Sequence, residues 1–346
     1  MQAQAPVYRR IVLIRTDRVG DLVLSTPAIA SFRLSWPRAR IEALVSGYTE
    51  PVLRHNPDID ALHTLADATS TQQRQRLARS LGAGADLAVA LAPRAADHEL
   101  CGWTRAPKRI GYVYRRRYLS RLGARLRLTD FCISEADPQL ADRHPGRAVA
   151  HEVEQVLALV ELAGGKATAR DLKLSPGTDD IMFAQRHVPQ GAVGLNLSPR
   201  WFAANFGLAA VKRLIARLAA GQRPLVIFYG SDVTSTVALV RNAVAADAVL
   251  WFGGLPLLHW CAALARCSVA VTVDSGATHV AAAMGVPVAV VFERRFYNLS
   301  SQEWCPWRVP YVLLRKPRPG GSHDELIAEI QRAVSFLGRQ SAVAPG

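Results

Sequence analysis

The sequence has little lysine and little cysteine. These two shortages limit the kinds of partner, cellular compartment and metal site that the chain is expected to have. Lysine occurs only five times in 346 residues, so nearly all of the positive charge behind the net +14 is arginine. Arginine favours bidentate contacts with phosphate or carboxylate, which indicates anionic partners such as a nucleotide, a phosphorylated molecule, a membrane surface or nucleic acid. The five cysteines form neither a CxxC pair nor an even framework. They fit a reducing compartment better than a secreted disulfide scaffold, and they imply no metal site.

Several familiar patterns are also missing. No GxGxxG follows the first apolar strand pattern, Ile11–Ile14, so dinucleotide binding has little support. The DxD pattern Asp58-Ile-Asp60 follows Asn56-Pro57 and is interpreted as turn chemistry rather than a metal site. The N-terminus is polar up to Arg10, and Gly or Pro breaks the longest apolar runs into strand-length pieces. We therefore expect neither a signal peptide nor a transmembrane helix.

What the sequence does contain is an alternation of strand and helix patterns, which predicts βαβ units and parallel sheets. Because 346 residues exceed one ordinary domain, two α/β domains are expected. Strands are expected at 11–14, 41–45, 63–65, 86–91, 109–112, 172–174, 193–197, 225–229, 249–251, 269–273, 288–292 and 311–314. Helices are expected at 27–35, 50–55, 70–81, 151–163, 207–220, 234–246, 256–266, 277–284 and 323–337, and an inter-domain region at 164–190.

The stretch 269–292 reads as strand, tight loop, helix and strand. Its apolar run ends at Asp274, and an Ala-rich helical turn opens near His279. The loop is therefore expected at the carboxyl edge of a parallel sheet, where ligands bind and where free N–H groups at a helix N-terminus favour a phosphate. A diphosphate could approach the backbone at three small or hydroxyl-bearing residues: Ser275, Gly276 and Thr278. The alternative is that Asp274 only caps the helix and that His279 is a satisfied surface histidine.

A second candidate segment directly follows the first strand pattern. Asp21 is expected just past the carboxyl end of that strand. Thr26-Pro27 predicts that the next helix begins at Pro27, with Thr26 as its N-cap. Asp17 lies among Arg15 and Arg18, a position typical of a paired structural carboxylate.

Residues 105–127 are strongly basic. Any single arginine there is more readily explained as part of a solvated loop, but the cluster as a whole indicates contact with an anion. Four members are assigned to an anionic acceptor or to the anionic membrane face that carries it: Arg115, Arg116, Arg117 and Arg121.

Four segments, spread over nearly the whole chain, share one resemblance: 15–29, 108–112, 151–153 and 274–287. Their residues and order are similar to those of the ADP-heptose lipopolysaccharide heptosyltransferases, glycosyltransferase family 9. The resemblance implies an α/β GT-B fold, with two Rossmann-like domains whose parallel sheets face a central cleft. It implies an acceptor-binding domain at 1–175, a nucleotide-sugar-binding domain at 176–322, and a C-terminal helix and tail at 323–346 that pack back on the first domain.

The resemblance also implies roles for single residues. Asp21 would be the general base of an inverting reaction that needs no metal, with Arg18 and Gly20 beside the acceptor. Asp232 would contact the ribose, and Leu255 would pack on the nucleotide base. The donor diphosphate would lie among the residues of one loop: Asp274, Ser275, Gly276, Thr278 and His279.

One departure from the family concerns the loop after the strand at 193–197. The family usually carries a small hydroxyl residue and then a lysine that holds the phosphates. Here Ser198 is retained, but Ala204 occupies the lysine position, and Arg200 is the candidate to supply the charge. Because lost phosphate contacts change how the leaving diphosphate is stabilised, this departure bears on the donor more than on the fold.

We therefore expect a cytoplasmic enzyme, with peripheral contact at the inner face of the cell membrane, that transfers a heptose from ADP-heptose to a lipopolysaccharide-core-like sugar hydroxyl. No cofactor is expected beyond the nucleotide-sugar co-substrate. The same fold with another nucleotide sugar, or with a natural-product or protein acceptor, stays open. So does a catalytically inactive binding protein, because of Ala204. A basic nucleic-acid-binding protein is the alternative of another class, although no recognised reader motif supports it.

Overall fold

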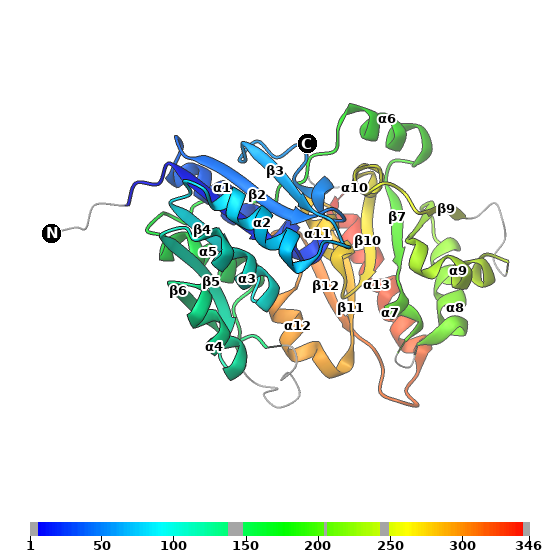
Figure 1. The fold of residues 1–346 in the computed structure, drawn as a ribbon. Helices are drawn as coiled ribbons and strands as arrows, with labels where there is room; N and C mark the ends of the chain where they lie inside the picture. The colour runs from blue at the N-terminus through cyan, green and yellow to red at the C-terminus, as the bar shows by residue number, and fades with distance from the viewer. Residues whose placement is uncertain (1–5, 138–147, 204–205, 243–248, 342–346) are drawn as a thin grey trace. The chain divides into compact units, whose positions relative to one another are not determined.

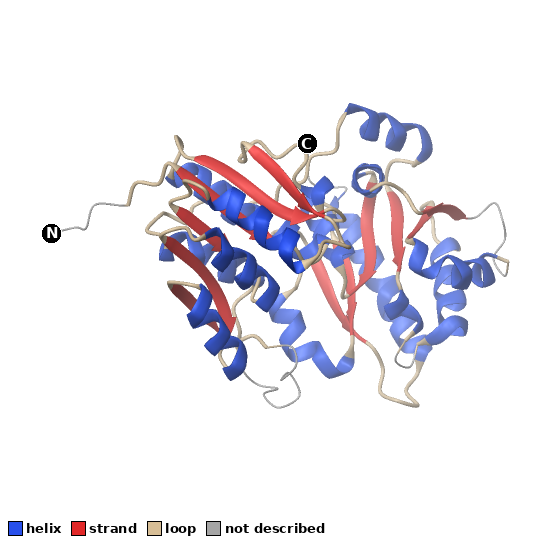
Figure 2. Ribbon diagram, viewed as in Figure 1, coloured by secondary structure: helices blue, strands red, loops and turns tan. Residues whose placement is uncertain are grey.

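The computed structural model describes residues 6–137, 148–203, 206–242 and 249–341 (Figure 1). The chain divides into two compact units, residues 1–174 and 175–346, where the sequence led us to expect a boundary at 175/176. Each unit holds one six-stranded sheet of parallel strands with helices packed around it (Figure 2).

The first unit has the strand order β3-β2-β1-β4-β5-β6, the arrangement of a Rossmann fold. Helices α2, α3 and α4 pack side by side over a core that includes the buried thiol of Cys101, and α1 packs against α5. The elements are β1 (Arg10–Arg15), α1 (Val19–Ser35), β2 (Arg40–Ser46), η1 (Glu50–Val52), β3 (Ala61–Leu65), α2 (Thr71–Gly82), β4 (Leu87–Ala90), α3 (Ala95–Thr104), β5 (Lys108–Tyr114), α4 (Tyr118–Arg127), β6 (Asp130–Ser134) and α5 (Glu152–Leu162).

The second unit repeats this order, β12-β11-β10-β7-β8-β9, when its strands are counted from its own first strand. Helix α10 carries the buried Cys261 and packs against α6. The elements are α6 (Thr178–His187), β7 (Ala192–Leu197), α7 (Pro199–Phe202), α8 (Gly207–Ala219), β8 (Leu225–Tyr229), η3 (Ser231–Val233), α9 (Thr234–Arg241), β9 (Val249–Gly253), α10 (Leu257–Ala265), β10 (Cys267–Val273), α11 (Gly276–Ala283), β11 (Val288–Phe292), η5 (Arg294–Phe296), α12 (Tyr297–Glu303), β12 (Tyr311–Arg315) and α13 (His323–Ser341).

The C-terminal helix α13 belongs to the second unit, and its expected packing on the first domain stays a prediction. Its apolar face, formed by Leu326, Ile330 and Leu337, is buried in the core that also holds α8 and β10. These side chains are at most 3% exposed, so burying this face within the second unit supplies the packing that stabilises the helix.

Helix α1 begins eight residues before the position expected from Thr26-Pro27, at Val19 rather than Pro27. Pro27 lies inside the helix, where its missing N–H leaves the carbonyl of Val23 without a helical donor. The hydroxyl of Thr26 donates to that carbonyl at 2.7 Å, so Thr26 repairs the helix rather than capping it. Asp21 consequently lies in the first turn of α1.

Other differences lie where the sequence pattern is weak. Residues 172–174 form no strand, and residues 178–187 of the expected inter-domain region form α6, which packs on α10. The turn interpretation of Asp58-Ile-Asp60 is confirmed: Asp60 accepts from the Ile41 amide at 2.7 Å, and Asp58 pairs with Lys173. The described elements without a sequence expectation are α3, α4, β6, α6, α7, η3, η5 and α12.

Candidate active site

In each unit, the central candidate residues follow the strands at which the sheet order reverses: Asp21 in the first unit, and Ser198, Arg200 and Asp274 in the second. In the first unit these strands are β1 and β4, and in the second they are β7 and β10. The crevice beyond the carboxyl ends of such a strand pair is where open α/β sheets bind ligands. Each unit therefore carries one candidate half-site.

Arg15 organises the half-site of the first unit from the end of β1. Its side chain is 2% exposed and donates to Asp17 at 2.9 Å, to Ser25 at 2.8 Å and to the Leu91 carbonyl at 2.8 Å. Asp21 lies next to this guanidinium, with Oδ1 3.8 Å from Nη2. Asp17 is thus paired with Arg15, as its sequence position indicates, while Asp21 lies farther from the same guanidinium.

Three residues of this half-site were not among the sequence candidates: Glu152, Tyr112 and Asp97. Glu152 Oε1 accepts from Arg15 Nη2 at 2.9 Å and from the Tyr112 hydroxyl at 2.7 Å, and its side chain is 2% exposed. Tyr112 and Glu152 belong to segments on which the family resemblance rests, 108–112 and 151–153. Those segments therefore converge on Arg15, although they lie far apart in the sequence.

Asp97 joins the cluster from the first turn of α3, after β4. Its Oδ1 accepts from the amide of Thr16 at 2.8 Å and from the Thr16 hydroxyl at 3.1 Å, which fixes the loop between β1 and α1. Burial and the nearby Asp17 raise the pKa of Asp97 to about 6.

The pKa of Asp21 is raised further, to about 7, because burial and the Asp17 carboxylate outweigh the opposing pull of Arg15. A carboxyl group with a pKa near neutral pH is suited to accept a proton during catalysis. Arg18, at the N-cap of α1, is exposed beside it, and Gly20 is buried in the first turn.

In the second unit, the expected strand, loop and helix around Asp274 are present as β10, a short loop and α11. Ser275 is the N-cap of α11 and Gly276 its first residue, so the N-terminal amides of the helix open at this loop. The hydroxyl of Thr278 contacts the Thr272 hydroxyl at 2.9 Å and donates to the Val273 carbonyl at 3.2 Å. Thr278 therefore supports the loop from beneath, and the His279 side chain is buried in the same turn.

The loop after β7 approaches Asp274 through Arg200. Its Nη1 donates to Asp274 Oδ2 at 2.8 Å and also to the Asp274 carbonyl. Ser198 lies at the end of β7, and its buried hydroxyl has no hydrogen-bond partner among the described residues. Ala204 lies outside the described residues.

Lys316 also reaches this loop, although no sequence pattern marks it as a candidate. It follows β12, is 1% exposed, and donates to Glu293 at 2.6 Å, to the Ala203 carbonyl at 2.9 Å and to the Arg200 carbonyl. Burial lowers the pKa of its ammonium group. With three acceptors on one buried ammonium, Lys316 fastens the backbone from which Arg200 extends.

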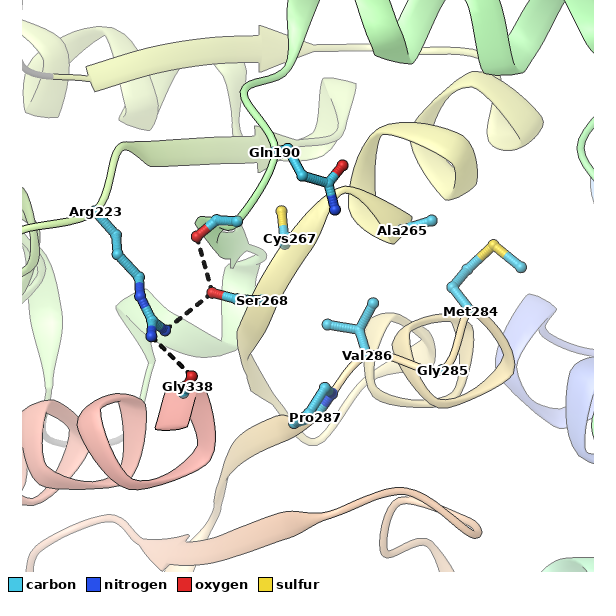
Figure 3. A pocket seen from close by; sticks show the side chains of 11 residues that line it. Gln190, Arg223, Ala265, Cys267, Ser268, Met284, Gly285, Val286, Pro287 and Gly338 are labelled. Atoms are coloured by element: carbon cyan, nitrogen blue, oxygen red, sulfur yellow. Dashed lines mark hydrogen bonds between the residues drawn. The ribbon is translucent and has the colours of Figure 1, made fainter. Parts of the chain in front are cut away.

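The remaining donor-side candidates lie at the same edge of the sheet. Asp232 is exposed in the short turn after β8, and Leu255 is half-buried between β9 and α10. A pocket of about 330 Å³ lies instead at the opposite edge, where Gly191 and Pro287 precede their strands (Figure 3). There Arg223 donates to Ser268 at 3.0 Å and to the Gly338 carbonyl at 2.8 Å, so its guanidinium serves the packing of α13.

The four basic candidates of the first unit differ in what they contact. Arg115 pairs with Glu135, and Arg117 pairs with Asp137 at 2.7 Å. Arg121 donates to the Arg115 carbonyl at 3.0 Å, and Arg116 is exposed. Two of the four charges are therefore partly neutralised within this unit.

Comparison with known proteins decides the family. The sequence profile of glycosyltransferase family 9 (heptosyltransferase) matches residues 139–318, more than half of the chain. The chain belongs to this family. Among solved structures, this family 9 chain resembles a glycosyl transferase family 9 protein from Veillonella parvula, with a TM-score of 0.77 at 19% identity over 98% of this chain and 99% of that one.

Two Escherichia coli structures share the same fold. ADP-heptose lps heptosyltransferase II matches with a TM-score of 0.71 at 19% identity, over 96% of this chain and 100% of that one. Heptosyltransferase WaaC with ADP matches with a TM-score of 0.68 at 15% identity, over 95% of this chain and 99% of that one. These likenesses establish the α/β GT-B-like fold expected from the sequence.

A sequence relative covers much less of this family 9 chain. The lipopolysaccharide heptosyltransferase 3 of Escherichia coli is 43% identical over 44 residues, which span 13% of each chain. Across the described residues, no helix has both the length and the apolar content to cross a membrane. Within that same part of the chain, no three His, Cys, Asp or Glu side chains gather as a metal site would need.

Proposed function

We propose that this protein is an inverting glycosyltransferase that transfers a heptose from ADP-heptose to a sugar hydroxyl of a lipopolysaccharide-core-like acceptor, without a metal ion. Membership of the heptosyltransferase family supports the reaction class. The observation that carries the mechanism is Asp21, whose carboxyl group has its pKa raised to about 7 at the carboxyl edge of the first sheet.

Asp21 acts as the general base in this proposal. A sugar hydroxyl is a poor nucleophile at neutral pH, and a carboxylate within hydrogen-bond reach can accept its proton as the new bond forms. The hydroxyl oxygen bonds to the anomeric carbon while the bond from that carbon to the diphosphate breaks, and attack opposite the leaving group inverts the centre. Asp17 is less suited to the role, because Arg15 Nε holds it at 2.9 Å.

The second half-site is proposed to hold the leaving ADP. The amides at the start of α11 and the guanidinium of Arg200 supply positive potential where the diphosphate develops charge. Ser198 adds a buried hydroxyl with no partner among the described side chains. Arg200 thereby supplies the positive charge of the family lysine that Ala204 replaces. Lys316 positions Arg200 by binding its backbone carbonyl. Asp232 and Leu255 are proposed at the ribose and the base.

A thermal-shift screen of ADP, UDP, GDP and CDP, each with and without EDTA, tests this function. At equal concentrations, ADP should stabilise the protein more than the other three nucleotides do. The gain in unfolding free energy should be about 2.7 kcal/mol when ADP is at 100 times its dissociation constant. Turnover of ADP-heptose with a core-oligosaccharide acceptor should survive EDTA. A larger shift with another nucleotide would move the donor to that nucleotide sugar, and activity that EDTA abolishes and magnesium restores would refute the metal-free mechanism.

A further inference from the structure

Helix α4 turns its large apolar side chains outward. Leu119 is 87% exposed, Leu126 79%, Tyr118 74% and Leu122 58%. Tyr118, Leu122 and Leu126 are spaced four residues apart, and Leu119 lies three before Leu122, so all four share one stripe of the helix. The buried side of α4 is instead formed around the small residue Ala124, which is 1% exposed.

Arginines lie before this stripe in the sequence and along one side of it. Residues 115–127 contain six arginines and no aspartate or glutamate. Arg116 and Arg125 are exposed, and helical spacing places Arg121 and Arg125 along one border of the stripe. A short helix with an exposed apolar face and arginines beside it is the pattern of a segment that lies in the interface of an anionic bilayer.

The exposed apolar residues of α4 differ from those elsewhere in the described chain. Leu34 on α1 and Leu239 on α9 are 63% and 57% exposed, and neither shares its described helix with another exposed large apolar residue. Helix α6 carries two, Ile181 and Met182 at 45% and 54%, but they are consecutive residues and do not continue into a stripe along the helix. Scattered single residues of this kind are ordinary, whereas a contiguous patch marks an interaction surface.

We propose that α4 docks the first unit onto an anionic lipid bilayer, with Leu119, Leu122 and Leu126 inserted among the lipid chains and the arginines at the headgroups. The proposal rests on the proposed function, since a glycolipid acceptor lies in such a surface. Arg115–Arg117 follow the carboxyl end of β5, at the edge of the sheet that carries Asp21. Docking there would present the acceptor sugar to the proposed base.

Charge favours a bilayer over the other partners. A second copy of this chain would bring the exposed Arg116 and Arg125 against the same two positive charges, which is unfavourable at close approach. A nucleic acid would satisfy the arginines but would leave the leucine stripe in water. An anionic membrane satisfies both parts of the surface.

Vesicle co-sedimentation of the full chain tests the proposal, with phosphatidylcholine alone and with phosphatidylcholine containing phosphatidylglycerol. Leu119→Ser/Leu122→Ser/Leu126→Ser should lower the partition coefficient on anionic vesicles by roughly tenfold or more. Arg125→Gln should lower it by roughly fivefold, because one arginine near the surface is removed. Leu34→Ser/Leu239→Ser and Arg76→Gln/Arg79→Gln are the matched controls and should bind as the wild type does.

The triple serine variant should keep the ADP-induced thermal shift and its turnover of a soluble, deacylated acceptor, because these leucines touch neither half-site. Equal binding to neutral and anionic vesicles, or unchanged binding of the triple variant, would overturn the proposal. A wild-type dimer that the triple variant converts to a monomer would assign the stripe to self-association instead. If the wild type bound anionic vesicles but not ADP, the proposed function would be refuted and the membrane surface would stand.

Discussion

The two units share one strand order but differ in the charge of the side chains at its reversal point. At the reversal point of the first sheet, three carboxylates lie within 4 Å of the guanidinium of Arg15, those of Asp17, Asp21 and Glu152. A fourth, Asp97, accepts from the amide of the neighbouring Thr16. At the reversal point of the second sheet, one aspartate, Asp274, meets Arg200 beside hydroxyl groups and the start of α11. The first arrangement can hold a proton and the second can hold an anion. The topology therefore supplies the location, and the loop residues decide the chemistry.

The strongest test of this contrast is to remove the basic group from the first unit. Asp21→Asn keeps the size of the side chain but cannot accept the acceptor's proton, so turnover should fall by roughly 10²–10⁴-fold. The ADP-induced thermal shift, which belongs to the second unit, should remain. Turnover kinetics and thermal shift on the same preparation check both statements.

Asp17→Asn is the matched control, because it changes a neighbouring carboxylate in the same loop. If Asp17→Asn were inactive while Asp21→Asn turned over within a few-fold of wild type, the base would be Asp17.

The second unit should respond in the opposite way. Arg200→Ala removes the cation next to Asp274 and should weaken ADP binding by roughly ten- to a hundredfold, as expected for a lost charge-assisted hydrogen bond. Isothermal titration calorimetry with ADP measures this loss. Arg213→Ala is a control of equal charge, since Arg213 pairs with Asp324 on α13. Unchanged affinity in Arg200→Ala would remove Arg200 from the diphosphate site.

The pH dependence of turnover should report the first unit. Because the base form of Asp21 is required and its pKa is about 7, kcat/KM should rise roughly tenfold between pH 6 and pH 8 and then level off. The slope should be absent from the residual activity of Asp21→Asn. A profile that is flat over this range would contradict the assignment.

The smallest expected effect concerns stability. A carboxyl group whose pKa is raised from 3.8 to about 7 on folding binds more protons in the folded state between these values, so its contribution to stability falls as pH rises through this window. Asp21→Asn removes that cost and should raise the free energy of unfolding at pH 8 by on the order of 1–2 kcal/mol. Thermal denaturation at pH 8 and at pH 4 measures it, and a gain of the same size at pH 4 would point to another cause.

The sequence predicted most elements whose apolar residues face inward with regular spacing. Helix α8 is an example, because Val211, Leu214, Ile215 and Leu218 share its buried face. Helix α4 escaped prediction because its pattern is reversed, with leucines outward and Ala124 inward. The start of α1 was misplaced because Thr26-Pro27 imitates a cap, and only the hydrogen bond from Thr26 to Val23 shows how the helix continues.

The candidate site was predictable where one segment carries the signal. Asp274 directly follows β10, and Asp21 lies in the first turn of the helix that follows β1, so sequence order alone brings both to a sheet edge. Glu152 reaches Arg15 because α5 packs on α1, and Tyr112 joins them from β5, two strands away from β1, through its hydroxyl bond to Glu152. Lys316 is a single lysine after the last strand, and its contacts with the backbone at Arg200 and Ala203, more than 110 residues earlier, leave no local pattern to recognise.

The buried cysteines give each unit its own internal reporter of opening. Burial raises the pKa of the Cys101 thiol to about 12 in the first unit and raises that of Cys261 in the second. Only a thiolate attacks an alkylating reagent, so neither sulfur reacts while its core is closed. The rate at which iodoacetamide labels each cysteine, read by peptide mass spectrometry, thus follows the local unfolding of one unit independently of the other.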